Sequence, residues 1–82
     1  MAKLAKLLIK AENNPQNISF AELCHLIEGH GFIWVHGEGS HRVYGRDGVR
    51  EVLVVQPGAN GKAKSYQVKQ LLRLIKKYTL EA

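Results

Sequence analysis

The spacing of apolar residues changes twice along this chain, and these changes limit the folds it can adopt. Apolar residues recur every three or four positions in residues 3–12, in 20–27 and again after residue 65, which predicts amphipathic helices. From Phe32 the period becomes two, as in a strand. The order helix, helix, strand, strand, strand, helix predicts an α+β protein. Its three-stranded antiparallel sheet should carry helices on one face.

The second helix has a clear start signal. Ser19 followed three residues later by Glu22 is a capping box, and Ile18 is available as a hydrophobic staple. Glycine after a last helical turn accepts the left-handed conformation that other residues resist. We therefore expect Gly29 to end this helix, and Gly29 and Gly31 together to mark the exit to the first strand.

Three strands are expected between residues 32 and 56. The first covers 32–36, and both of its faces should be largely covered. The second covers roughly 40–45. The dipeptide at 47–48, Asp-Gly, predicts a tight hairpin because both central residues of the favoured turn adopt positive φ. The third strand should run over 49–56. Its continuous apolar centre leads us to expect that it is well covered.

Residues 58–64 form a glycine-rich basic loop that we expect to be flexible. The loop resembles a phosphate-binding Walker loop, which needs a glycine five residues before its Gly-Lys pair and a Ser or Thr after it. Gln56 and Ala63 occupy those positions, so nucleotide hydrolysis is rejected.

The last helix is expected to begin with Ser65 as its cap. Backbone amides at that helix start, with Lys62 and Lys64 beside them, are suited to hold a phosphate. The competing interpretation is an ordinary solvated basic face.

Composition limits the size and the partners of the protein. Its 82 residues fit a single domain, and 45% apolar residues suffice for a modest core. Twelve Lys and Arg against seven Asp and Glu give a net charge of +5. This excess favours a polyanion or an acidic protein as the partner over a neutral small molecule.

The single cysteine and the absence of long apolar runs bear on the compartment. Cys24 has no partner for an intrachain disulfide or a cysteine-based zinc site, and its helical spacing predicts a buried thiol. Lysines interrupt the N-terminal apolar segment, which lacks the centre of a secretory signal. We expect no membrane span and a cytoplasmic protein.

The segment 39–44, Gly-Ser-His-Arg-Val-Tyr, offers one histidine at the start of the second expected strand. A lone imidazole at a strand end is as often structural as catalytic, so its context must decide. If Val43 faces the helices, His41 lies at the margin of the sheet. If Tyr44 faces inward, His41 lies on the open face. The sequence leaves both arrangements open.

A metal site is not expected. His36, Glu38 and His41 straddle a glycine turn, they lack the helix of an HExxH site, and the chain has no cysteine pair. We therefore predict that the protein uses no metal or other cofactor.

The chain combines a capped helix ending in GHGF, the segment GSHRVY after a short strand, a hairpin, and the run QPGANGKAKSYQVKQLLRLIKKY. Together these segments resemble the HicA family of toxins from bacterial toxin–antitoxin pairs. The resemblance covers roughly 17–78 and leaves 1–14 as an additional helix of a single domain spanning 1–82. It implies a fold like that of a double-stranded RNA-binding domain, whose α-β-β-β-α order matches the last five elements.

The resemblance also implies an activity, that of a metal-independent endoribonuclease which cuts mRNA and blocks translation. The family's catalytic histidine corresponds to His41. RNA carries its own nucleophile, the 2′-hydroxyl, so a base that removes this proton suffices to start cleavage. His36 or Tyr44 is a candidate for the second proton transfer. Position 42 is Arg where a second histidine is common in the family, so His41 has no adjacent imidazole.

Partners follow from the same resemblance. An acidic HicB-type antitoxin is expected to neutralise the toxin, and mRNA is the expected substrate. The candidate RNA-binding residues are Ser40, Arg42, Lys62, Lys64 and Lys69. The alternative function is a non-catalytic RNA-binding module of the same fold, which would not need His41.

Overall fold

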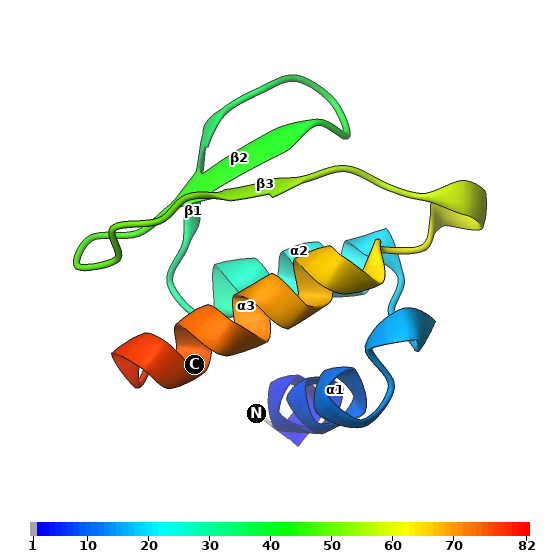
Figure 1. Cartoon of the computed structure of the whole chain (residues 1–82), viewed down its shortest axis with the longest axis horizontal. Coiled ribbons are helices and arrows are strands. Elements are labelled where there is room, and N and C mark those ends of the chain that lie inside the picture. The colour runs from blue at the N-terminus through cyan, green and yellow to red at the C-terminus, as the bar shows by residue number, and fades with distance from the viewer. Residues whose placement is uncertain (1) are drawn as a thin grey trace.

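The predicted fold class is confirmed. The computed structural model describes residues 2–82, which form three α-helices and one antiparallel sheet with the strand order β1-β2-β3 (Figure 1). The elements are α1 (Ala2–Asn13), α2 (Phe20–Gly29), β1 (Ile33–His36), β2 (Arg42–Gly45), β3 (Leu53–Val55) and α3 (Ser65–Tyr78). Short 3-10 turns at Pro15–Asn17 and Ala59–Gly61 precede α2 and α3.

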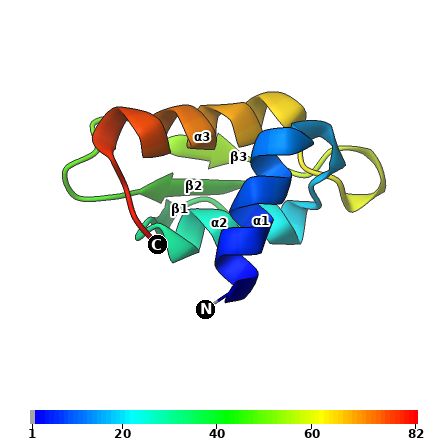
Figure 2. The same cartoon turned by 90° about the horizontal axis from the view of Figure 1, so that it is seen from below.

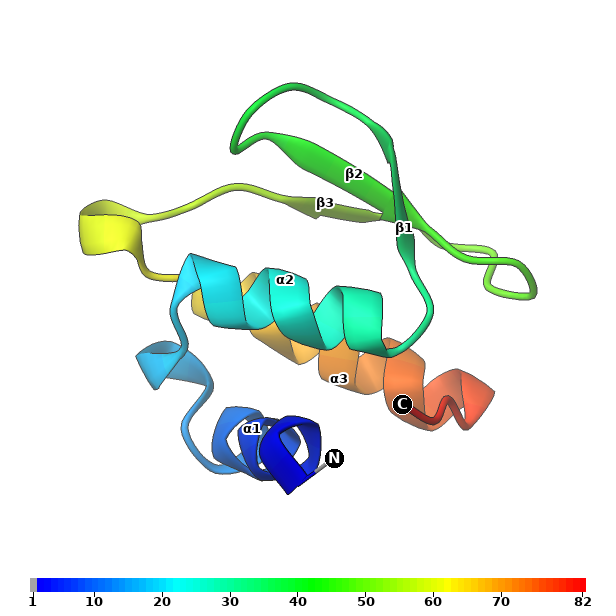
Figure 3. The ribbon, with the colours of Figure 1, turned by 180° about the vertical axis from the view of Figure 1, so that it is seen from behind.

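The elements lie in three layers. α2 and α3 cover one face of the sheet, and α1 packs on the other side of these two helices (Figures 1 and 3). Seen from below, α1 runs across both of them (Figure 2). The opposite face of the sheet carries no helix among the described residues. The helices therefore lie on one face, as the sequence predicts, with α1 as a second helical layer.

The core lies between the helix pair and the sheet. Its central side chains are Leu23, Leu26 and Ile27 of α2, Tyr44, Leu53 and Val55 of the sheet, and Val68, Leu71 and Leu74 of α3. Each of these side chains is at most 3% exposed. Burial of one such side chain stabilises the fold by about 1.5–3 kcal/mol. This layer therefore fixes which side of each strand faces the helices.

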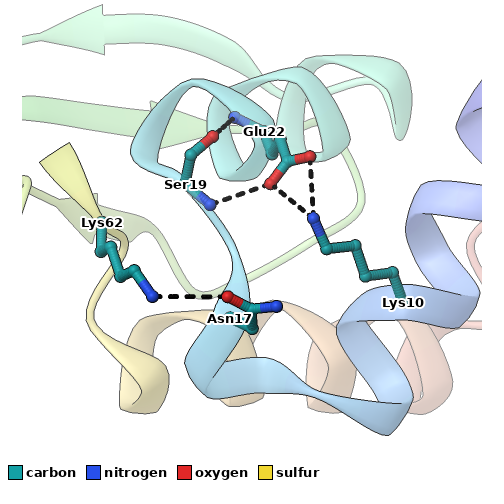
Figure 4. A network of polar contacts seen from close by, with 5 residues as sticks. All are labelled: Lys10, Asn17, Ser19, Glu22 and Lys62. Carbon is teal, nitrogen blue, oxygen red and sulfur yellow. Dashed lines mark hydrogen bonds and ion pairs between the residues drawn. The ribbon is translucent and has the colours of Figure 1, made fainter.

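The capping box predicted for α2 is confirmed. The backbone N–H of Glu22 donates to Ser19 Oγ at 3.0 Å, and the backbone N–H of Ser19 donates to Glu22 Oε1 at 2.9 Å (Figure 4). This backbone hydrogen bond is the main cause that lowers the pKa of the Glu22 carboxyl. Lys10 Nζ lies 3.2 Å from Glu22 Oε2. The cap thereby also ties α1 to the start of α2.

The end of α2 differs from the prediction. Gly29 is the last helical residue, and the left-handed conformation belongs to Gly31, whose φ is +89°. A glycine at 29 serves packing instead, since a Cβ there would lie 2.6 Å from Cδ2 of Leu4 on α1. Local spacing could not reveal this, because Leu4 is distant in sequence.

Two predictions about the strands are wrong. β1 is exposed along its whole length, with Ile33 65% and Val35 54% exposed. Trp34 pairs with the inward-facing Tyr44, so Ile33 and Val35 face away from the helices. β3 is shorter than expected and alternates, since Leu53 and Val55 are buried while Val54 is 57% exposed. Helices on one face of the sheet leave the other face of an apolar strand in water.

A turn forms at Asp47 and Gly48, but the tight hairpin predicted there does not, since β2 ends at Gly45 and β3 begins only at Leu53. Gly48 has a φ of +84°, and the backbone N–H of Val49 donates to the Arg46 carbonyl at 3.1 Å. Asp47 does not have the positive φ that the predicted turn type requires. The turn is therefore present with a single left-handed residue.

The loop before α3 is tied to the rest of the protein. The backbone N–H of Gly58 donates to the Lys62 carbonyl at 2.7 Å, and that of Ala63 donates to the Ile18 carbonyl at 2.8 Å. These bonds connect the loop that the sequence predicts to be flexible to itself and to the segment before α2. Ser65 is the first helical residue and Lys64 occupies the cap position, so the predicted Ser65 cap is wrong.

The connection after β2 is anchored to the end of α3 through Glu51. Its carboxylate accepts from the Tyr78 hydroxyl at 2.6 Å and from Lys77 Nζ at 2.8 Å. The bond from Lys77 is the largest cause and the bond from Tyr78 the next. Together they lower the pKa of Glu51 from an ordinary value of 4.5 to about 2. The pKa is depressed in the folded state, so the stabilisation is fully present above pH 4.5 and is lost as the pH falls toward about 2.

Replacement of Glu51 with glutamine should therefore lower the melting temperature by a few degrees at neutral pH. The difference from the wild type should shrink as the pH falls through this window. Thermal unfolding followed by circular dichroism across acidic pH measures it. A difference that stays constant through the window would contradict the proposed anchoring by the Glu51 carboxylate.

Candidate functional site

The turn between β1 and β2 presents His41 to solvent. Its backbone bends through two glycines of positive φ, Gly37 at +101° and Gly39 at +60°. The backbone N–H of His41 donates to the Glu38 carbonyl at 3.0 Å and closes the turn. Ser40 and His41 are both exposed. The imidazole thus lies exposed on a hydrogen-bonded turn, where a large substrate can reach it.

The direction in which Tyr44 faces decides between the two positions, sheet margin and open face, that the sequence leaves open for His41. Tyr44 is fully buried and faces the helices, so alternation along β2 places Arg42 on the same side and Val43 on the other. His41 immediately precedes β2 and continues this alternation. It therefore lies toward the open face, at the start of the strand.

Gly37 makes close backbone packing within the turn possible. A Cβ at this position would overlap the carbonyl oxygen of His41 and lie 3.3 Å from the Cα of Arg42. The close approach of the two ends of the turn therefore requires a residue without a side chain. In the sequence, the two glycines around Glu38 are the feature that could have indicated this close approach.

The side chain of Arg42 points back under the turn. Its guanidinium lies 4.4 Å from the ring centre of Trp34 and 5.7 Å from that of Phe20. Arg42 Nε donates to the Gly39 carbonyl at 3.2 Å, and one terminal nitrogen donates to the Tyr44 hydroxyl at 3.0 Å. The Tyr44 bond is the main cause that raises the pKa of Arg42. Arg42 therefore joins the turn to the core.

Tyr44 and Glu28 complete this polar cluster. The Tyr44 hydroxyl donates to Glu28 Oε2 at 2.6 Å, and Arg42 lies 3.9 Å from the same carboxylate oxygen. Burial, with the Glu28 bond, raises the pKa of Tyr44 far above its usual range. The hydroxyl thus stays protonated and committed to Glu28. Burial also raises the pKa of the neighbouring Cys24 thiol, which confirms the prediction of a buried cysteine.

Trp34 holds the other end of the turn. Its indole N–H donates to the His36 carbonyl at 2.7 Å, while its ring receives the guanidinium of Arg42. Trp34 lies in the strand expected over 32–36, and its contacts with the turn were not predicted from the sequence. A partner two residues along the same strand has no signal in the sequence.

The predicted basic residues lie at the same end of the molecule as His41. The start of β2, the turn Ala59–Gly61 and the start of α3 are all at this end (Figure 1). Lys62 is exposed and donates to Asn17 Oδ1 at 3.3 Å (Figure 4). Lys64 is half-buried at the start of α3, and Lys69 is exposed about one turn further along that helix.

The described residues carry neither a metal-ligand cluster nor a membrane-spanning helix. Residues 2–82 contain no group of three His, Cys, Asp or Glu side chains placed to hold a metal ion. Among the same residues no helix is long and apolar enough to cross a membrane.

Comparison with protein families identifies the chain. The model of the family described as the HicA toxin of bacterial toxin–antitoxin systems matches residues 20–80. Searches of curated proteins and of solved structures gave no significant match. The family match begins at the first residue of α2 and includes the turn with His41, the whole sheet and α3. It covers well over half of the sequence, so the chain belongs to the HicA family of toxins from bacterial toxin–antitoxin systems.

Proposed function

We propose that this protein is a metal-independent endoribonuclease that cuts mRNA, with His41 as the acid–base residue that removes the first proton. The observation that carries the proposal is the exposed imidazole on a turn fixed from beneath by Arg42 and Trp34. The chain belongs to a toxin family and carries a net charge of +5. An imidazole that acts as an acid or base must be accessible to the substrate and held in position.

The chemistry requires two proton transfers. His41 takes the proton of a ribose 2′-hydroxyl, whose oxygen attacks the adjacent phosphorus, and the 5′-oxygen leaves after receiving a proton. The Tyr44 hydroxyl is buried and donates to Glu28, which argues against it as the second group. His36 is exposed at the other end of the same turn. Of the two candidates from the sequence, we therefore assign His36 to protonate the leaving oxygen.

Lysines near the site supply the attraction for RNA. We assign Lys62, Lys64 and Lys69, together with the exposed Ser40, to contacts with the phosphate backbone. Charged contacts to phosphates release counterions, so RNA affinity should fall steeply with salt. Their place at the same end of the molecule as His41 supports this assignment.

Toxicity and its control follow from this activity. Cleavage of mRNA in the cytoplasm would block translation, and an acidic HicB-type antitoxin would neutralise the toxin by covering the basic end that carries His41. Complementary charge would speed the encounter. Addition of salt should therefore slow the association of the two proteins.

Cleavage of a labelled RNA in excess chelator tests the proposed activity. We expect products with a 2′,3′-cyclic phosphate end, and no cleavage of a substrate whose riboses are all replaced by 2′-deoxyribose. Purification through denaturation and refolding, or parallel preparation of an inactive variant, controls for a contaminating nuclease. RNA binding without any cleavage would instead support the alternative, a non-catalytic RNA-binding module.

A further inference from the structure

The guanidinium of Arg42 is surrounded by acceptors and aromatic rings from its own chain. Nε bonds to the Gly39 carbonyl, a terminal nitrogen bonds to the Tyr44 hydroxyl, and Glu28 lies 3.9 Å away. The rings of Trp34 and Phe20 lie within 5.7 Å of the guanidinium carbon. The Arg42 side chain is 27% exposed, although its backbone neighbour His41 is exposed. Arg42 is thus bound mainly to protein.

We propose that Arg42 and Trp34 are positioning residues that hold the His41 turn in its reactive geometry. Their action on catalysis rests on the proposed function. In this assignment the guanidinium of Arg42 donates hydrogen bonds to the Gly39 carbonyl and the Tyr44 hydroxyl, and not to a phosphate of the RNA.

The two residues act on both ends of the same turn. Trp34 fixes the His36 carbonyl, where the chain leaves β1, and Arg42 fixes the Gly39 carbonyl, two residues before His41. Stacking of the Arg42 guanidinium on the Trp34 ring at 4.4 Å links the two contacts into one unit. Tyr44 and Glu28 then join this unit to β2 and α2. These contacts connect the turn to the core, and none of them involves the side chain of His41.

Lysine cannot reproduce this arrangement. It keeps the positive charge of Arg42 but lacks the planar fork that reaches two acceptors while stacking on a ring. The substitution Arg42→Lys therefore separates the two roles. A phosphate contact needs mainly the charge, whereas a positioning contact needs the geometry.

Single-turnover cleavage over a range of protein concentrations tests the proposal. We expect Arg42→Lys to lower the saturating rate by about 10-fold or more, because small displacements of a catalytic group are costly, and to change the half-saturating concentration by less than about 2-fold. Arg50→Lys is the matched control, since Arg50 is exposed on the connection at the opposite end of β2. It should retain both constants. A raised half-saturating concentration with an unchanged saturating rate would mean that Arg42 contacts phosphate, and would overturn the proposal.

A second measurement does not depend on activity. Amide hydrogen exchange by NMR reports the bond from the His41 N–H to the Glu38 carbonyl. Arg42→Lys should speed exchange at this amide several-fold, and so should Trp34→Phe, which keeps an aromatic ring, though a smaller one, and removes the N–H donor. Exchange at the wild-type rate in both variants would overturn the positioning role. If the wild-type protein cleaves no RNA, the proposed function fails, and exchange alone still decides whether Arg42 and Trp34 hold the turn.

Discussion

Replacement of His41 with alanine is expected to lower the rate of RNA cleavage by about 10²–10⁴-fold, the usual contribution of a positioned general base. The side chain is exposed and takes no part in the core, so the variant should fold as the wild type does. The proposed function assigns the attraction to RNA mainly to the lysines, so affinity should change by less than about 2-fold. Single-turnover cleavage in excess chelator and fluorescence anisotropy with labelled RNA measure the two quantities. Expression of the variant should no longer arrest growth.

His25→Ala is the matched control for this experiment. His25 is an exposed histidine on α2, and its replacement removes the same chemical group from another part of the surface. We expect this variant to cleave at the wild-type rate. The assignment of His41 would be wrong if His41→Ala retained the wild-type rate. It would also be wrong if both variants lost activity equally.

The second large effect is expected from Gly37→Ala. Gly37 has a φ of +101°, and a Cβ there would overlap the backbone carbonyl oxygen of His41. A carbonyl cannot swing away as a flexible side chain can, so the turn must open. We expect cleavage to fall by about 10²-fold, the cost of a displacement of roughly 1 Å at a reacting group. Stability should fall by about 1–3 kcal/mol for the strained backbone.

Gly48→Ala separates strain from displacement. Gly48 also has a positive φ, +84°, but within the described part of the chain nothing lies within 4 Å of a Cβ placed there. It should therefore lose stability from strain and keep the wild-type cleavage rate. Urea unfolding and single-turnover cleavage measure the two effects. If Gly37→Ala cleaved as fast as Gly48→Ala, the geometry of the turn would not matter for catalysis.

Features that depend on near neighbours in the sequence were predicted well. The capping box of Ser19 and Glu22 joins groups three residues apart, and the apolar spacing of α3 lies on a single helix, so each can be read from a short window. The same holds for the buried position of Cys24. The order of elements and the placement of helices on one face follow from these local patterns.

Contacts between distant residues explain the features that were not predicted. Leu4 fills the space beside Gly29, and the loop before α3 is hydrogen-bonded to Ile18. Gln67 of α3 is 3% exposed although glutamine is polar, and its side chain accepts from the backbone N–H of Gln56 at 3.4 Å. None of these partners is specified by the spacing of apolar residues near it.

The sequence by itself determined the fold class, the family resemblance and the choice of His41 as the candidate catalytic residue, because these depend on local periodicity and on short motifs. The tertiary structure alone decided that His41 lies toward the open face and that the guanidinium of Arg42 is directed under the turn toward Trp34 and Tyr44. The physical reason is the one-sided cover of the sheet. Burial of Tyr44 against the helices fixes the parity of β2, and this parity sends Arg42 into the protein and His41 toward solvent.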